Sequence, residues 1–302
     1  MASIALIGAP SQSGGRPVGV ARGVGALRAA GLVSALRLGG HHVLDQGDVA
    51  LPPPVATRDP ASRVVNPAGL SALVRAVDAA VTQARAVGSF PVVLGGDCPM
   101  LLGGLTATPG AGLLHVDGHE DAYTPEESPT GDSADSEIAF ALGLAVFSWD
   151  AALMVRQPMV EERHLVLVGQ RDLPDLERHG VASLGSRCTL FDATAVHAAP
   201  EVVASKAVGQ AREALGGFWL HLDWDVLSNE EIGSVIFPRP GGLTWSDLAT
   251  VMAVALAEPT CRGWSVGTYN PDLDPDGADA VRIVQFLTQA LSVLDEREER
   301  TA

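Results

Sequence analysis

The chain has 302 residues, of which 47% are hydrophobic and 19% are charged, and its formal net charge at pH 7 is −16. This length allows one large domain or two ordinary ones, and the apolar fraction is high enough for an extensive core. An acidic surface repels the phosphate backbone of nucleic acids, so the composition argues against nucleic acid as a partner.

The cysteines and the hydropathy bear on the cellular compartment. Cys98, Cys188 and Cys261 form no CxxC pair and no disulfide framework, which predicts a reducing environment. The apolar run over residues 1–8 lacks a basic leader and a cleavage pattern, and no uninterrupted apolar stretch is long enough to cross a bilayer. We therefore predict a cytoplasmic protein without a membrane partner.

Short apolar runs alternate with longer stretches rich in alanine, leucine and valine. In chain order the predicted elements are strand Ser3–Gly8, helix Gly23–Leu38, strand His41–Asp45, helix Pro67–Val87, strand Phe90–Leu94, strand Gly112–Val116, strand Leu165–Gly169, strand Phe218–Leu222, helix Trp245–Ala257, strand Gly263–Thr268 and helix Asp279–Asp295. Apolar strands separated by helices indicate a parallel sheet that is covered on both faces. No linker or internal repeat interrupts the pattern, so we predict one α/β domain over residues 1–302, with a frayed charged tail after residue 295.

Polar side chains of metal-ligand type follow four of the predicted strands. They are Asp97-Cys98, the triplet Asp117, His119 and Asp121, the single Asp172, and the pair Asp223 and Asp225. Ligands bind beyond the carboxyl ends of strands in open α/β sheets, and alternate residues leaving a strand project to the same side. The DxHxD triplet therefore directs three ligands to one point, and the DxD pair adds two from another strand.

Carboxylates combined with an imidazole suit Mn²⁺, Fe²⁺, Co²⁺ or Zn²⁺. Four aspartates in one pocket would repel one another, and two divalent ions would remove that repulsion and lower the pKa of a bridging water. A DxD pair alone is common on loops, an aspartate after a strand is often only a helix cap, and Cys98 alone could be an inert buried thiol. The two motifs together favour a two-metal hydrolase.

These motifs resemble those of the arginase/agmatinase family, the ureohydrolases, and the likeness covers nearly the whole chain. The segment 95–98 is similar to the family's Gly-Gly-Asp-His signature, 117–121 to its Asp-Ala-His-x-Asp motif, and 223–225 to its Asp-x-Asp motif. The resemblance implies a three-layer αβα fold with a mostly parallel central sheet and two Mn²⁺ ions.

Carried over by position, the resemblance assigns six metal ligands. Asp117 and Asp223 would bridge the two ions, Cys98 and Asp121 would complete one site, and His119 and Asp225 would complete the other. A hydroxide that bridges the ions would attack a guanidine carbon, with Asp121 as the candidate catalytic residue.

Three positions depart from the family pattern. Cys98 replaces the signature histidine, which favours softer ions. Ala134 stands where arginases carry a histidine thought to shuttle protons, and the loss of such a group usually lowers the rate by about 10² to 10⁴. Thr268 replaces a glutamate that grips the guanidinium.

The loss of these groups should slow the hydrolysis of a less basic guanidine by less than it slows the hydrolysis of arginine. The cysteine and the missing histidine together resemble one branch of the family, which cleaves Nω-hydroxy-L-arginine to hydroxyurea and L-ornithine in D-cycloserine biosynthesis. The alternatives are another ureohydrolase, such as an arginase, an agmatinase or another guanidino-acid hydrolase, and a metal-binding pseudoenzyme. The expected partner is a small guanidino compound, and the oligomeric state stays open, with a monomer possible.

The resemblance also implies that the amino-acid end of the substrate meets the loop Tyr123–Gly131 and the segment Asp172–Asp175. Candidate substrate contacts are Tyr123, Thr130, Asp132, Asp172, Asp175 and Thr268. A simpler explanation for Asp172 is an ion pair with its neighbour Arg171.

Overall fold

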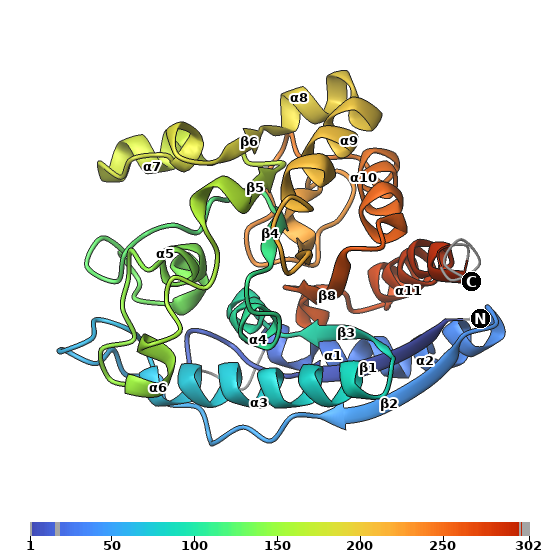
Figure 1. Ribbon diagram of the computed structural model, residues 1–302, viewed down its shortest axis with the longest axis horizontal. Helices are drawn as coiled ribbons and strands as arrows, with labels where there is room; N and C mark the ends of the chain where they lie inside the picture. The colour runs from blue at the N-terminus through green and yellow to red at the C-terminus, as the bar shows by residue number, and fades with distance from the viewer. Residues whose placement is uncertain (1, 16–18, 296, 298–302) are drawn as a thin grey trace.

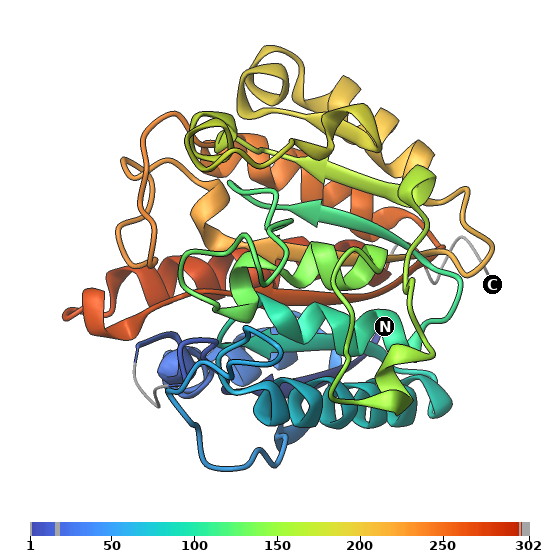
Figure 2. The ribbon, with the colours of Figure 1, turned by 90° about the vertical axis from the view of Figure 1, so that its left-hand side faces the viewer.

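A single parallel sheet organises the chain in this computed structural model, which describes residues 2–15, 19–295 and 297. Its strands are β1 (Ser3–Ala9), β2 (His42–Asp48), β3 (Phe90–Gly95), β4 (Gly112–Val116), β5 (Leu165–Val168), β6 (Thr189–Phe191), β7 (Phe218–Asp223) and β8 (Cys261–Gly267). They lie in the order β2-β1-β3-β8-β7-β4-β5-β6, and every neighbouring pair is parallel. Figure 2 shows β4 and β5 side by side, pointing in the same direction. All strands therefore end at one edge of the sheet.

Helices cover both faces of this sheet (Figure 1). They are α1 (Gly23–Ala29), α2 (Leu32–Leu38), α3 (Pro67–Ala86), α4 (Leu101–Ala107), α5 (Glu137–Leu142), α6 (Ala151–Met154), α7 (Leu173–His179), α8 (Ala193–Ala198), α9 (Pro200–Ala211), α10 (Trp245–Ala257) and α11 (Ala278–Leu291). One hydrophobic cluster joins the sheet to α1, α2, α9, α10 and α11, and a second joins it to α3, α4 and α5. The three-layer αβα fold with a parallel sheet is thus confirmed.

Successive residues of a strand belong to different hydrophobic clusters, one on each face of the sheet. In β4, Leu114 and Val116 belong to the cluster with α9 and α10, whereas Leu113 belongs to the cluster with α3 and α4. Successive side chains of a strand point to opposite faces, so His115 and the following Asp117 lie on the α4 side of the sheet. That side carries the candidate site.

The structure corrects parts of the sequence prediction. The predicted helix Gly23–Leu38 divides into α1 and α2 because Gly31 adopts a left-handed backbone with φ of 93°. Strand β6 and helices α4 to α9 were not predicted, since most of them are short and lack a clear hydrophobic period. Most of the charged tail lies outside the described residues.

Within residues 2–15, 19–295 and 297, no single helix has the length and apolar character needed to span a bilayer. The bent pair Gly19–Ala29 and Leu32–Leu38 meets the criteria of length and composition together.

Helix α4 packs closely on strand β7, and this contact can be tested by substitution. A Cβ on Gly104 would lie 2.2 Å from Cε2 of Trp219, a fully buried residue of β7. We expect Gly104→Ala to lower the free energy of unfolding by about 1–3 kcal/mol, because overpacked cores must shift their neighbours. Urea titration followed by circular dichroism measures the change.

The matched control is Gly209→Ala in α9, where an added Cβ meets no described atom within 4 Å. Since alanine is the better helix former, this variant should gain about 0.5–1 kcal/mol. Equal effects of the two substitutions would contradict the packing of α4 on Trp219.

Candidate metal centre

The predicted ligands meet where β4 and β7 end. The two strands are neighbours, and Val116 pairs with Leu222, so the next residues, Asp117 and Asp223, emerge side by side at the carboxyl edge. Cys98 follows β3 and reaches the same point from the segment that leads into α4, and its Sγ donates to Oδ2 of Asp223 at 2.9 Å. Residues from three distant parts of the chain therefore share one site.

The DxHxD and DxD motifs interlock through short contacts. Oδ1 of Asp117 accepts the backbone N–H of His119 at 2.8 Å. Nδ1 of His119 lies 3.1 Å from Oδ2 of Asp225, whose Oδ1 accepts the backbone N–H of Gly118 at 3.2 Å. One ligand atom from each of Asp117, His119 and Asp225 lies within 4.8 Å of the others, so these three residues could hold one divalent ion.

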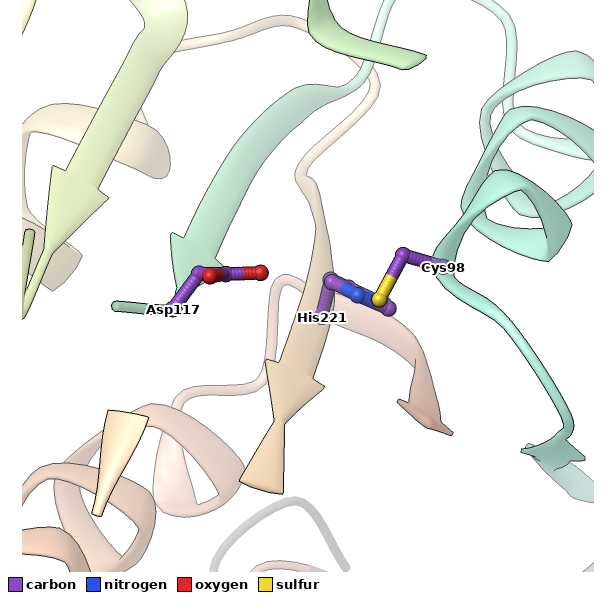
Figure 3. Close-up of side chains that lie close together, drawn as sticks. All are labelled: Cys98, Asp117 and His221. Carbon is purple, nitrogen blue, oxygen red and sulfur yellow. The ribbon is translucent and has the colours of Figure 1, made fainter. Parts of the chain in front are cut away.

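Two further groups satisfy the same distance criterion, and both contain Asp117. They are Cys98, Asp117 and His221, and His115, Asp117 and Asp121. Figure 3 shows Cys98 and Asp117 on either side of the His221 ring. Asp117 is therefore common to all three groups, whereas Asp223, the other residue predicted to bridge the ions, belongs to none of them.

Several buried polar atoms around Asp117 have no hydrogen-bond partner in the part of the chain that the structure describes. They are Oδ2 of Asp117, Nε2 of His221, both ring nitrogens of His115 and both carboxylate oxygens of Glu137. Buried polar atoms normally have partners, because leaving them unpaired costs free energy. Their concentration at one place fits a site that binds cations.

The pKa values of the site also reflect buried groups that destabilise one another. The pKa values of Cys98, Asp121 and Asp223 are all well above the ordinary values of these groups. Burial is the largest cause, and neighbouring carboxylates raise the three pKa values further. Burial alone would lower the pKa of His119, but Asp225 and Asp117 hold it well above its usual range. Mutual repulsion of this kind is relieved when divalent ions bind the carboxylates.

Two non-glycine residues at the site have a left-handed backbone. The φ angle is 46° at Asp121 and 75° at Thr268. A β-branched residue such as threonine rarely adopts a positive φ, and such strain tends to occur at functional sites. The Thr268 conformation is held by its N–H, which donates to Gly96 O at 2.7 Å, and by its hydroxyl, which donates to Asp223.

A cavity of about 250 Å³ opens above these groups. The predicted residues that line it are Cys98, His119, Asp121, Tyr123, Thr130, Asp172, Asp175, Asp223, Asp225 and Thr268, together with Ala134. Asp117 is fully buried beneath them, and Asp132 is not among the lining residues. The structure therefore brings most of the predicted site residues to one cavity.

The rim residues already have partners of their own. The Tyr123 hydroxyl lies 3.0 Å from Nδ1 of His179, and the Thr130 hydroxyl donates to Asp135 at 2.5 Å. Asp175 forms ion pairs with two further cavity residues, Arg178 and Arg239.

Asp172 and Arg171 point to different partners. Oδ2 of Asp172 accepts the N–H of Glu120 at 3.0 Å, and Arg171 donates to the carbonyls of Asp225 and Leu227. No ion pair between Asp172 and Arg171 is found among the described residues. The simpler explanation for Asp172 therefore finds no support here.

Sequence reasoning missed two histidines of this site. His115 and His221 each stand two residues before a strand-end aspartate, and they pair with each other across β4 and β7. Their rings stack with centroids 5.3 Å apart. The repeated pattern His-x-Asp at 115–117 and 221–223 was the available signal, because residues two apart in a strand share a face.

Comparison with known proteins agrees with this geometry. A model of the arginase family matches residues 2–292. An arginase from Bacillus caldovelox is 27% identical over 282 residues, which cover 91% of this chain and 93% of that protein. Arginase-1 from Rattus norvegicus is 26% identical over 298 residues, which cover 93% and 88%.

Solved structures show the same fold. The native arginase of Bacillus caldovelox superposes with a TM-score of 0.79 at 25% identity, covering 96% of this chain and 98% of that one. The agmatine ureohydrolase of Thermoplasma volcanium reaches 0.72 at 16% identity, with coverage of 99% and 92%. The chain therefore belongs to the arginase family, the ureohydrolases, metal-dependent enzymes that hydrolyse carbon–nitrogen bonds of guanidino compounds.

Proposed function

We propose that the protein hydrolyses Nω-hydroxy-L-arginine to hydroxyurea and L-ornithine. The observation that carries the proposal is the wall of the cavity: Ala134 and Thr268 line it beside the ligand residues Cys98 and Asp121. Ala134 cannot transfer a proton, and the Thr268 hydroxyl is already bonded to Asp223. Positions 134 and 268 thus offer neither a histidine nor a carboxylate to a strongly basic guanidinium. A hydroxyguanidine is less basic and carries its own hydroxyl.

Two divalent ions, when bound, activate a water for attack and stabilise the charge that develops on the guanidine carbon. The water oxygen bonds to that carbon, and the bond to the side-chain nitrogen of the ornithine half breaks. We assign the proton that this leaving nitrogen needs to Asp121, whose half-buried carboxyl lines the cavity and would take the proton that the attacking water loses. Carboxyl groups placed beside the reacting atoms act as general acids and bases in this way.

The rim would hold the amino-acid end of the substrate. Asp172 is 4% exposed and suits the α-amino group, and the hydroxyls of Tyr123 and Thr130 would meet the α-carboxylate after exchanging their present partners. Asp132 would act indirectly, because its backbone N–H donates to Oγ1 of Thr130 at 2.9 Å. Asp175 would order the rim through Arg239.

Manganese is our proposal for the ion held by Asp117, His119 and Asp225, since two carboxylates and one imidazole form a largely hard ligand set. Asp223, Asp121 and Cys98 would belong to the second ion. The alternative within the family is another guanidino substrate. Equal turnover of substrates with and without the hydroxyl group would favour that alternative.

The substrate proposal is tested by a panel of three compounds. We expect the Mn²⁺-loaded protein to turn over Nω-hydroxy-L-arginine at least about 10²-fold faster than L-arginine, because the proton-transfer histidine is absent. Agmatine should react poorly, since it lacks the carboxylate that the rim would bind. Chromatography of hydroxyurea, urea and ornithine measures the rates. Fast arginine turnover would exclude this specialisation, and no turnover would favour a pseudoenzyme.

Ala134 offers a test in the opposite direction. Ala134→His should raise the kcat for L-arginine by about 10- to 100-fold, because it restores a proton carrier to the wall of the cavity. Ala134→Gln is the matched control, similar in size but unable to transfer protons. If both variants change kcat equally, the missing histidine is not the cause of slow arginine hydrolysis.

Asp172 gives a pH-dependent prediction. Burial raises the pKa of Asp172 to about 6, above the range usual for an aspartate. The folded metal-free protein therefore binds a proton that the unfolded chain releases, and its stability falls as the pH rises from about 4 through about 6. Asp172→Asn should be more stable than the parent at pH 8, by up to about 3 kcal/mol, and equal to it near pH 4. Urea denaturation at both pH values measures this; a difference independent of pH would contradict it.

A further inference from the structure

His221 is buried beneath the strand-end ligands and takes no part in the hydrolysis proposed above. It stands in β7 two residues before Asp223, so its ring lies on the same face of the sheet as that carboxylate. A ring nitrogen of His221, Sγ of Cys98 and a carboxylate oxygen of Asp117 lie within 4.8 Å of one another (Figure 3). All three residues are buried.

A structural role accounts for only part of the His221 ring. Nδ1 lies 2.8 Å from Oγ of Ser265, and the ring stacks on His115. Nε2 has no hydrogen-bond partner among the described residues, although the residue is 0% exposed. A histidine that merely filled the core would be expected to satisfy both nitrogens or to be replaced by an apolar residue.

The surroundings of Ser265 are compatible with the tautomer of His221 that carries its proton on Nδ1. Oγ of Ser265 accepts the indole N–H of Trp219 at 2.9 Å, and its own proton can point to the Leu220 carbonyl at 3.4 Å. The remaining lone pair of Oγ then accepts Nδ1–H of His221. In this tautomer Nε2 carries a free lone pair, as in metal sites where a hydrogen bond to the other nitrogen orients the ligating imidazole.

We propose that Nε2 of His221 is a metal ligand and that it forms, with Cys98 and Asp117, a site for a divalent ion softer than Mn²⁺, of which zinc is the candidate. Thiolate, imidazole and carboxylate are the usual ligands of zinc. Cys98 stands where the resemblance places an imidazole, and His221 supplies one from the sheet below. Only the thiolate binds, so the Cys98 proton is released to water as the ion enters. This inference concerns the ion and needs no turnover of any substrate.

The experiment measures metal binding by the full-length metal-free protein. Zinc affinity is obtained by competition with a chromophoric chelator, and Co²⁺ serves as the optical probe. We expect the wild type to show a thiolate-to-cobalt charge-transfer band that is absent in Cys98→Ser. His221→Asn should weaken zinc binding at least about 10-fold and alter the cobalt spectrum while keeping the thiolate band.

His41→Asn is the matched control, because His41 is also buried but belongs to none of the groups of closely placed ligand atoms found among the described residues. It should change zinc affinity by less than about 3-fold, well below the loss of a ligand. Retention of wild-type zinc affinity in His221→Asn, or an equal loss in His41→Asn, overturns the proposal.

A second measurement avoids substitutions at His221. X-ray absorption of the His119→Asn variant loaded with one equivalent of zinc should show one sulfur and one imidazole on the same ion. Zinc without sulfur, or zinc with sulfur but no imidazole, would also overturn the assignment, even if the His221 variants fail to fold.

Discussion

The arrangement of the candidate metal centre depends on the buried carboxylate of Asp117 at the end of β4. Its carboxylate is fully buried directly after β4, accepts the backbone N–H of His119, and belongs to each of the three groups of closely placed ligand atoms. A buried carboxylate is stable only beside positive charge or strong donors, and Oδ2 of Asp117 has no hydrogen-bond partner in the described residues. Nε2 of His115 lies 3.4 Å from this oxygen and Nδ1 of His119 lies 3.6 Å from Oδ1, so the surrounding strands and loops place two imidazoles beside the buried carboxylate.

The register of β4 and β7 determines how this charge is surrounded. Pairing of His115 with His221 and of Val116 with Leu222 places two strand-end aspartates side by side, with two imidazoles beneath them. On the opposite face, the same strands contribute Leu114, Val116 and Leu222 to an apolar core. A shift of one residue would turn these apolar side chains towards the site and bury the aspartates in the core. Core packing and ligand placement thus depend on the same pairing.

The differences from the family pattern fall on the wall of the site as well as on one of its ligands. Ala134 and Thr268 remove a proton carrier and a carboxylate from the cavity, and Cys98 replaces an imidazole. His221 and Glu137 are buried, and each carries polar atoms without a hydrogen-bond partner among the described residues. The metal centre retains its ligand capacity while the substrate-facing surface changes. This combination is the basis of the proposed change of substrate.

Much of this protein was determined by local sequence. Unbroken apolar runs, several of them followed by aspartate or cysteine, were enough to predict a parallel sheet and the gathering of Cys98, His119 and Asp225 at its carboxyl edge. Only the tertiary structure could show that Gly31 divides a predicted helix, that Asp132 stays out of the cavity, and that His115 and His221 stack beneath Asp117. Strand order and register depend on pairing between segments far apart in the chain, and no periodicity within one segment encodes them.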